Sequence, residues 1–210
     1  CTIFFDMHSV FIQSRSANAL EFASCQSRFE NVRSIERATG TTGTDAFVAL
    51  LDPAQSGSLT LTYATYLGGL QFDEATAITS FGGQIYVAGS TSSDDFPVVK
   101  AYQSVRAPGR DLWVAQIDPN QSGTASLVVS TFFGGASADY ARTLLVDAPG
   151  HAYVGGVTFS ADFPLSPNAY QTKYAGGGDG FLTEFNLSNA SGGYSTFLGG
   201  SGIDDVRKIV

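Results

Sequence analysis

The sequence predicts an all-β protein, a β-propeller of four-stranded antiparallel blades that is present here as a partial, open arc. Three observations lead to this fold class. Short blocks of sequence recur about every 66 residues. Each period divides into four short apolar runs that are separated by turn residues. The third run of each period is apolar on both of its faces, as in a sheet that is covered on both sides.

The recurring blocks fix the period. The block Thr65–Gly69 reads TYLGG, and it returns as TFFGG at Thr131–Gly135 and as TFLGG at Thr196–Gly200. A second block, which reads DAFVA at its first appearance, begins at Asp45, Asp111 and Asp179. Because both blocks keep their order and spacing, the periods are copies of one structural unit.

Two further signatures appear twice each. Gly89–Pro97 and Gly156–Pro164 share the pattern G-x-T-x-S-x-D-F-P. The sequence AYQ follows both of them, at Ala101–Gln103 and Ala169–Gln171. Signatures that recur in a fixed order cannot be due to chance, and they strengthen the assignment of a repeat.

Turn residues divide one period into four expected strands. In the period that ends at Gly135, we expect strands over residues 74–80, 84–91, 111–118 and 126–133. Gly82 and Gly83 form the first turn, residues 118–123 form the last, and a long loop lies between the second and third strands. Gly, Pro and Asn mark these junctions, as turn geometry requires.

The third expected strand of each period distinguishes a propeller from a sheet with one wet face. Successive side chains of a strand point to opposite faces, and residues 46–51 are apolar throughout. Phe47, Trp113 and Phe181 are equivalent, so we expect them to pack between neighbouring blades. A parallel β-helix is the rival fold, but its repeats are shorter, about 20–30 residues.

Together these blocks resemble the bacterial seven-bladed β-propeller (SBBP) repeat of secreted and surface-associated bacterial proteins. The resemblance covers residues 40–210 and rests on the four recurring signatures. It implies a β-propeller fold and an extracellular or cell-surface location. The family has no agreed biochemical activity, so the resemblance implies no catalytic residues.

The repeat divides the chain into five parts. Residues 1–39 are a non-repeat segment, 40–69 a half blade, 70–135 and 136–200 two full blades, and 201–210 the first strand of a further blade. Propellers close with about 4–8 blades, so we expect other blades of the same protein, or other copies, to complete the ring.

The N-terminal segment 1–39 departs from the repeat. It lacks Gly and Pro and holds both cysteines, Cys1 and Cys25, whose pairing stays open. The segment is interpreted as a non-repeat cap, a degenerate blade or mistranslated sequence, with a helix around residues 17–25.

Composition excludes two classes of partner. The formal net charge of −8 disfavours nucleic acid, which needs a basic surface. No stretch approaches the roughly 18 apolar residues of a membrane-spanning helix, so no membrane insertion is expected.

Acidic residues also recur, and they suggest a possible site. The recurring carboxylates after the Gly-Gly pairs and in the long loops are Asp73, Asp139, Asp204, Asp95 and Asp162. Together with the aspartates that open the third strands, they are expected at one face of the propeller. One hypothesis is Ca²⁺ binding, because Ca²⁺ prefers oxygen ligands. The alternative is that each Asp accepts hydrogen bonds from the backbone of its own turn.

The long loops at residues 92–110 and 159–178 are the most variable parts of the repeat, and they are the expected surface for a protein or glycan ligand. The candidate binding residues on these loops are Tyr102, Arg106, Arg110, Tyr170, Lys173 and Tyr174. No catalytic motif is present. His151 takes the place of Gln84 in the other full period and is expected to be a surface or turn residue.

The sequence therefore predicts a non-enzymatic, secreted or surface-exposed repeat module that acts as a scaffold or binding platform. The alternative is a fragment of a propeller enzyme, a hydrolase or lyase, with its active site in other blades. The first strands of the periods offer Glu74, Arg142 and Arg207 at the expected channel, which is no recognisable catalytic set.

Overall fold

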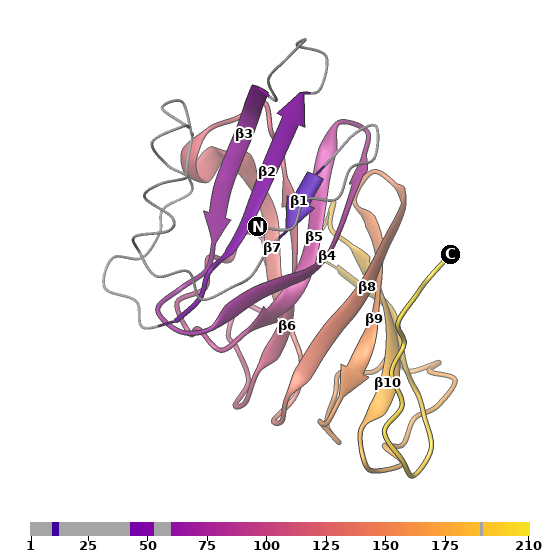
Figure 1. Cartoon of the computed structure of the whole chain (residues 1–210). Coiled ribbons are helices and arrows are strands. Elements are labelled where there is room, and N and C mark those ends of the chain that lie inside the picture. Colours follow the sequence, from indigo (N-terminus) through magenta and orange to yellow (C-terminus); the bar gives the residue numbers. More distant parts are fainter. Residues whose placement is uncertain (1–9, 13–42, 53–59, 190) are drawn as a thin grey trace.

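The computed structural model describes residues 10–12, 43–52, 60–189 and 191–210. The described residues form antiparallel strands, turns, loops and one short 3-10 helix, and they contain no α-helix. The strands are arranged in three sheets that lie side by side (Figure 1).

Sheet 1 contains β1 (Val10–Ile12), β2 (Ala46–Asp52) and β3 (Thr60–Leu67), in that spatial order. Sheet 2 contains β4 (Asp73–Phe81), β5 (Gln84–Thr91), β6 (Asp111–Ile117) and β7 (Leu127–Phe133), with the 3-10 helix η1 (Gly123–Ser126) before β7. Sheet 3 contains β8 (Asp139–Ala148), β9 (His151–Thr158), β10 (Asp179–Asn186) and β11 (Ser191–Leu198). Neighbours in sheets 2 and 3 follow the chain order, so each is an up-and-down meander.

The prediction of an all-β protein with four-stranded antiparallel sheets is confirmed. The strand expected over 84–91 is β5. Strand β4 is one residue longer at each end than expected, β6 ends one residue earlier, and β7 begins one residue later. Gly82 and Gly83 form the tight turn between β4 and β5, with φ of 59° and 79°. Positive φ at both turn positions is the geometry for which Gly is the favoured residue.

Residues 201–210 form no strand, contrary to the expectation for that segment. They run alongside sheet 3, where the backbone N–H of Val206 donates to the carbonyl of Gly156 (3.1 Å). In sheets 2 and 3 the first strand takes its ladder from the hairpin strand that follows it. The described residues offer no such hairpin partner to 201–210, so no ladder forms.

Strand β1 comes from the non-repeat segment 1–39. It pairs with β2 on the side opposite β3, with Ile12 opposite Val48. In sheet 2 the equivalent residue, Val114, lies opposite Ala88 of β5. Strand β1 therefore occupies the place of a second strand, which is the arrangement expected of a degenerate repeat. The expected helix at 17–25 and both cysteines lie outside the described residues.

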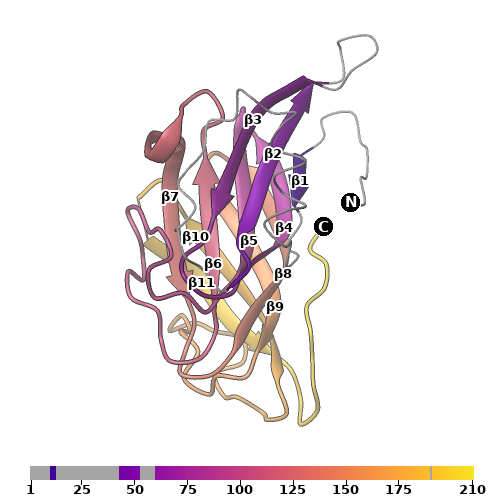
Figure 2. The same cartoon turned by 60° about the vertical axis from the view of Figure 1, so that its left-hand side comes forward.

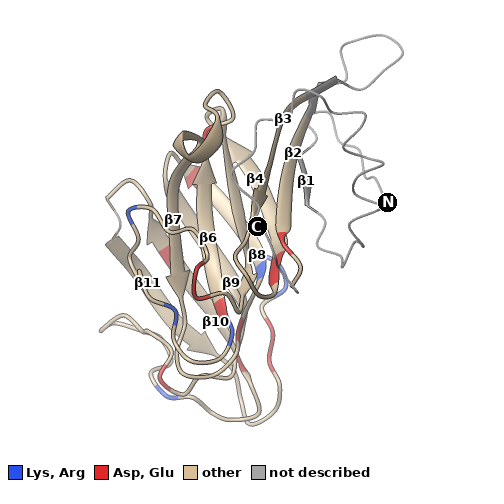
Figure 3. Cartoon of the chain, turned by 90° about the vertical axis from the view of Figure 1, so that its left-hand side faces the viewer, with Lys and Arg blue, Asp and Glu red and all other residues tan. Residues whose placement is uncertain are grey.

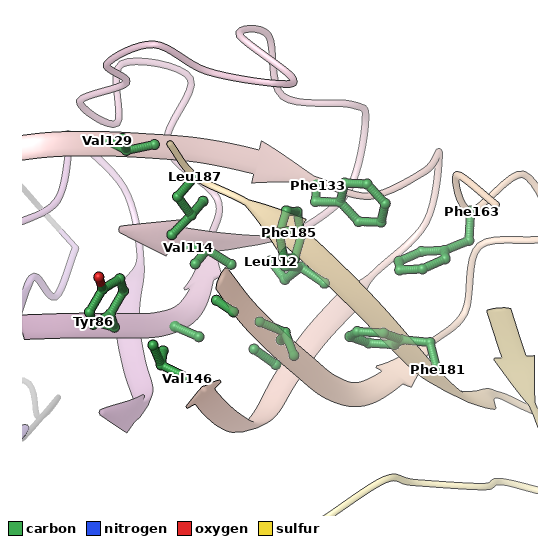
Figure 4. Close-up of a cluster of buried hydrophobic side chains, with 14 of the residues drawn as sticks. Tyr86, Leu112, Val114, Val129, Phe133, Val146, Phe163, Phe181, Phe185 and Leu187 are labelled. Atoms are coloured by element: carbon green, nitrogen blue, oxygen red, sulfur yellow. The ribbon is translucent and has the colours of Figure 1, made fainter. Parts of the chain in front are cut away.

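Two apolar clusters hold the three sheets together. One lies between sheets 2 and 3, where Tyr86 and Phe133 of sheet 2 meet Phe181 and Phe185 of sheet 3 (Figure 4). The other lies between sheets 1 and 2 around Trp113. Strand β4 packs on β8, so the sheets meet through their first strands (Figure 2). Of the three ring positions expected to pack between repeats, Trp113 and Phe181 are fully buried, and Phe47 is partly buried.

Gly89 and Gly156 occupy equivalent places where two strands approach closely. A Cβ atom at either position would lie 1.9 Å from a backbone carbonyl oxygen, that of Glu74 or Tyr140. Each carbonyl belongs to a first strand that is bulged at this point. Only Gly allows such a close backbone approach, which explains the Gly that opens the G-x-T-x-S-x-D-F-P signature.

The long loops cover the outer edges of sheets 2 and 3. Val99 and Gln103 form bridges to Ser130 and Phe132 of β7. In sheet 3, the N–H of Phe197 donates to the carbonyl of Gln171 (3.3 Å). The loops thereby pair with some backbone N–H and C=O groups of the edge strands, which could otherwise pair with a strand of another chain.

Candidate functional site

The repeated aspartates lie where one sheet passes into the next. Asp139 begins β8, and its Oδ2 accepts hydrogen bonds from the N–H of Gly135 (2.9 Å) and the hydroxyl of Ser160 (3.0 Å). Its Oδ1 accepts a hydrogen bond from the hydroxyl of Thr158. Asp139 is fully buried, so both of its carboxyl oxygens are satisfied by protein donors.

The same arrangement is found one period earlier. Asp73 accepts hydrogen bonds from the N–H of Gly69 (2.8 Å), from the hydroxyl of Ser93 (2.8 Å) and from that of Thr91. The Thr and Ser of each T-x-S-x-D pattern therefore serve the Asp that follows each Gly-Gly pair.

The last Asp of that pattern caps the link between sheets. Asp162 accepts a hydrogen bond from the N–H of Ala136, and Asp95 accepts one from the N–H of Leu70, both at 2.9 Å. The repeated carboxylates thus bond the backbone of the link, which is the habitual role of Asp in turns.

Backbone hydrogen bonds then tie each link to the preceding sheet. The N–H of Asp139 donates to the carbonyl of Arg110 (2.6 Å), and the N–H of Asp73 donates to that of Thr44 (2.6 Å). The N–H of Asp204 makes the third equivalent bond, to Gly178 (2.8 Å).

The Gln of each AYQ signature closes the network. The side-chain amide of Gln103 donates to Asp111 Oδ2 (3.0 Å), and its oxygen accepts from the N–H of Gly134 (3.2 Å). Gln171 makes the same two bonds, to Asp179 (2.8 Å) and from Gly199 (2.9 Å). These pairs could not be predicted from the sequence, because their members come from different strands and loops.

Burial raises the pKa of three of these carboxyl groups. Desolvation raises the pKa of Asp73 and of Asp139 to about 6, against the opposing effect of their hydrogen-bond donors. Desolvation raises the pKa of Asp111 to about 7, and the nearby Asp139 carboxylate adds to the shift. Figure 3 shows several acidic residues near the ends of the sheets where these links lie.

The aspartates proposed as Ca²⁺ ligands therefore accept hydrogen bonds from donors within the protein. Asp204 also accepts a hydrogen bond, from the N–H of Gly200 (2.6 Å). Among the described residues, no three His, Cys, Asp or Glu side chains gather in a way that could hold a metal ion. The geometry favours the turn role over the Ca²⁺ role.

Addition of Ca²⁺ is expected to leave the Tm of the protein unchanged relative to chelator. A ligand raises Tm only if it binds the folded state preferentially, and each of these aspartates already accepts at least one hydrogen bond from the protein. Thermal unfolding followed by circular dichroism in Ca²⁺, in Mg²⁺ and in chelator checks this. A rise in Tm with Ca²⁺ alone would contradict it and revive the metal-site hypothesis.

Two of the loop residues proposed to bind a ligand are engaged within the protein. The guanidinium of Arg106 bonds Asp94 Oδ1 (2.5 Å) and the carbonyls of Ala107 and Gly109. That of Arg110 lies 4.0 Å from the centre of the Phe72 ring and 3.4 Å from Glu74. Both cations stabilise loop structure.

The other loop candidates differ in exposure. Tyr174 packs against Phe197, with ring centres 5.9 Å apart, at the edge of the core. Tyr102 is half exposed and lies on Phe133, whereas Tyr170 and Lys173 are exposed. Tyr170 and Lys173 are therefore the candidates that the structure leaves open to a ligand.

Sheet 3 carries a polar cluster that the sequence did not reveal. His151 Nδ1 lies 2.6 Å from Asp147 Oδ1, and Nε2 lies 2.7 Å from Glu184 Oε1. The hydrogen bond to Glu184 is the main cause of the raised pKa of His151. In the sequence, the one sign of this cluster is that His151 stands where the preceding period has Gln84. Its acidic partners could not be predicted, because they are set by strand pairing.

The first-strand residues at the expected channel form ion pairs rather than a catalytic set. Glu74 pairs with Arg110, while Arg142 and Arg207 both approach Asp205, at 3.5 and 3.2 Å. A shallow hollow between sheets 2 and 3, of about 140 Å³, is lined by Tyr102, Leu165, Ser166, Glu184, Gly192 and Gly193 among others.

No protein-family model matches the chain, and no curated protein matches it. Among the described residues, no helix has the length and apolar character needed to cross a membrane.

Proposed function

We propose that this chain is part of a β-propeller of the SBBP repeat type and serves as a non-enzymatic, secreted or surface-exposed scaffold of a bacterium. Support comes from sheets 2 and 3, which have the same strand order and stack through β4 and β8. The repeated hydrogen-bond network at each link has no catalytic arrangement and serves to hold successive sheets in place.

The observation that carries the proposal is the exposure of apolar side chains on the outer face of sheet 3. Phe133 of sheet 2 is covered by sheet 3 and only 2% exposed, but its equivalent Leu198 is 36% exposed. Tyr86 is fully buried and accepts a hydrogen bond from the N–H of Gly150, whereas its equivalent Tyr153 is only partly buried. Sheet 3 thus presents the face that sheet 2 uses to bind the next sheet.

The AYQ tyrosines show the same contrast. Tyr102 reaches across to sheet 3, where its ring lies so close to Gly192 that an added Cβ would be 2.9 Å away. It is 49% exposed, whereas Tyr170, which has no following sheet to reach, is 82% exposed.

Residues 201–210 already follow the path of a first strand of a further sheet. Asp204 makes the same backbone bond to sheet 3 that Asp139 makes to sheet 2. Val206, the counterpart of Ala141, lies against Gly155 and Gly180. A fourth sheet of the same kind would therefore continue the stack on this face and cover Leu198 and Tyr153.

Extension of the chain by one repeat is expected to raise its stability. Val210 corresponds to Leu145, so residues 146–210 appended after Val210 continue the repeat in phase. The added sheet should dock, raise the Tm and slow hydrogen exchange of the backbone amides of β9, β10 and β11. Thermal unfolding and hydrogen exchange measured by mass spectrometry provide the readouts.

The matched control is the same extension with Leu198→Asp, which places a charge beneath the docked sheet and should remove most of the gain in Tm. If the appended repeat exchanges its amides as fast as an unfolded chain while residues 43–200 stay protected, the propeller scaffold proposal is wrong.

Recognition by this scaffold would fall to the long loops. The structure uses Phe96 and Gln103 of the first long loop for the core and the link, so whole-loop replacement would damage the fold. The side chains free for a protein or glycan ligand are those of Val105, Tyr170 and Lys173, which project from loops on a rigid framework.

A further inference from the structure

Two buried carboxyl groups meet at the junction of sheets 2 and 3. Asp111 begins β6, Asp139 begins β8, and both are fully buried. Both lie close to Gly134: a Cβ atom there would lie 2.6 Å from Asp139 Oδ2 and 3.1 Å from Asp111 Oδ1. One acid comes from each sheet, so the pair spans the contact between them.

The two acids differ in their hydrogen bonds. Asp139 accepts hydrogen bonds at both oxygens. Asp111 accepts at Oδ2 only, from the side chain of Gln103 and the N–H of Ala107 (2.9 Å). Asp111 Oδ1 is buried and has no hydrogen-bond partner. A bare, buried oxygen of an ionised carboxylate is costly, whereas a proton on Oδ1 would remove the charge and supply a donor.

We propose that Asp111 is held as the neutral acid, with its proton on Oδ1 beside the carboxyl group of Asp139, so that the contact between sheets 2 and 3 is proton-dependent. The folded junction takes this proton from solvent, and the unfolded chain releases it at neutral pH. The junction is therefore tighter in mild acid than in mild base.

The charges around the pair agree with this assignment. Asp139 raises the pKa of Asp111 and Arg106 lowers it, but burial is the largest effect and brings the value to about 7. Asp162 raises the pKa of Asp139, which is about 6. Asp111 is therefore the acid that carries the proton, because its Oδ1 lacks a hydrogen bond whereas both oxygens of Asp139 accept one.

The sign of the pH effect follows from these values. An unfolded Asp has a pKa near 3.9, and a raised value in the folded state means that folding takes up a proton. The stabilisation from Asp111 is complete below about pH 4 and is lost as the pH rises through about 7.

The next junction repeats the arrangement. Asp179, which begins β10, accepts hydrogen bonds at Oδ2 from Gln171 and from the N–H of Ala175 (3.0 Å). Its Oδ1 is also buried without a hydrogen-bond partner. Asp204 flanks Gly199 on the other side, as Asp139 flanks Gly134. The uncapped oxygen is thus a recurrent feature of the repeat.

The test is the pH dependence of unfolding for the whole chain and for Asp111→Asn. The amide oxygen of Asn can keep the bonds from Gln103 and Ala107. Its NH2 group places a donor at the Oδ1 position and does not need to take up a proton from solvent. The unfolding constant of the natural chain should rise between pH 5 and 7 by about 50-fold more than that of Asp111→Asn, as expected for one proton with a folded pKa of about 7 and an unfolded pKa near 3.9.

Asp94→Asn is the matched control, because the Asp94 side chain is 76% exposed, and its pH profile between 5 and 7 should parallel that of the natural chain. Carboxyl carbon NMR of the natural chain gives a second readout that needs no variant. The Asp111 resonance should titrate well above pH 5. A midpoint at or below pH 4, or an Asp111→Asn profile parallel to that of the natural chain, would overturn the proposal.

Discussion

Replacement of Trp113 by alanine is expected to lower the free energy of unfolding by about 3–5 kcal/mol. The indole is fully buried between sheets 1 and 2, with the Phe96 ring centre 4.9 Å away. Its loss would leave a large cavity in a cluster that holds two sheets together, and neighbouring strands cannot collapse to fill it. Urea unfolding followed by circular dichroism measures the change, since the chain has no other tryptophan for fluorescence.

Trp113→Phe is the matched control, and it should cost much less than Trp113→Ala. Phe is the residue at the equivalent positions 47 and 181, and the indole Nε1 has no hydrogen-bond partner to lose. A Phe variant as unstable as the Ala variant would mean that the repeat positions are not equivalent in packing.

The strands could be predicted because their limits are set by local chemistry. Gly82 and Gly83 adopt positive φ in a tight turn, so β4 ends just before them and β5 begins just after them. Because the sequence repeats, the strand boundaries of one period predict those of the next, where β8 and β9 are the equivalent strands. In sheet 2, the apolar character of both faces of β6 correctly indicated a sheet covered on both sides, because Trp113 and Val114, on opposite faces, are both fully buried.

The roles of the polar residues could be predicted only in part. Asp in a turn bonds nearby backbone, so the bonds from Gly69 to Asp73 and from Gly135 to Asp139 follow from a spacing of four residues. The pairing of Gln103 with Asp111 across the loop, and that of His151 with Glu184, depends on strand register and loop path. A single sequence does not specify these neighbours.

Removal of the Asp139 carboxyl group is expected to have an effect of similar size. In Asp139→Ala the N–H of Gly135 and the hydroxyls of Thr158 and Ser160 lose their acceptor. Each unsatisfied buried donor costs about 1–3 kcal/mol, so the loss of the acceptor for three donors should cost at least about 3 kcal/mol. Urea unfolding should be measured at pH 5, below the Asp139 pKa of about 6, where the cost of a buried charge does not offset the loss.

Asp139→Asn distinguishes a turn acceptor from a ligand of some bound group. At pH 5 the amide resembles the neutral acid in shape and keeps an acceptor oxygen, so the Asn variant should lose less than half as much stability as the Ala variant. A ligand-binding carboxylate would behave differently, because in the ligand-free protein both changes would leave the fold nearly as stable as before. A large loss for Ala with a small one for Asn would mean that Asp139 recurs in the repeat because every link between sheets needs its acceptor.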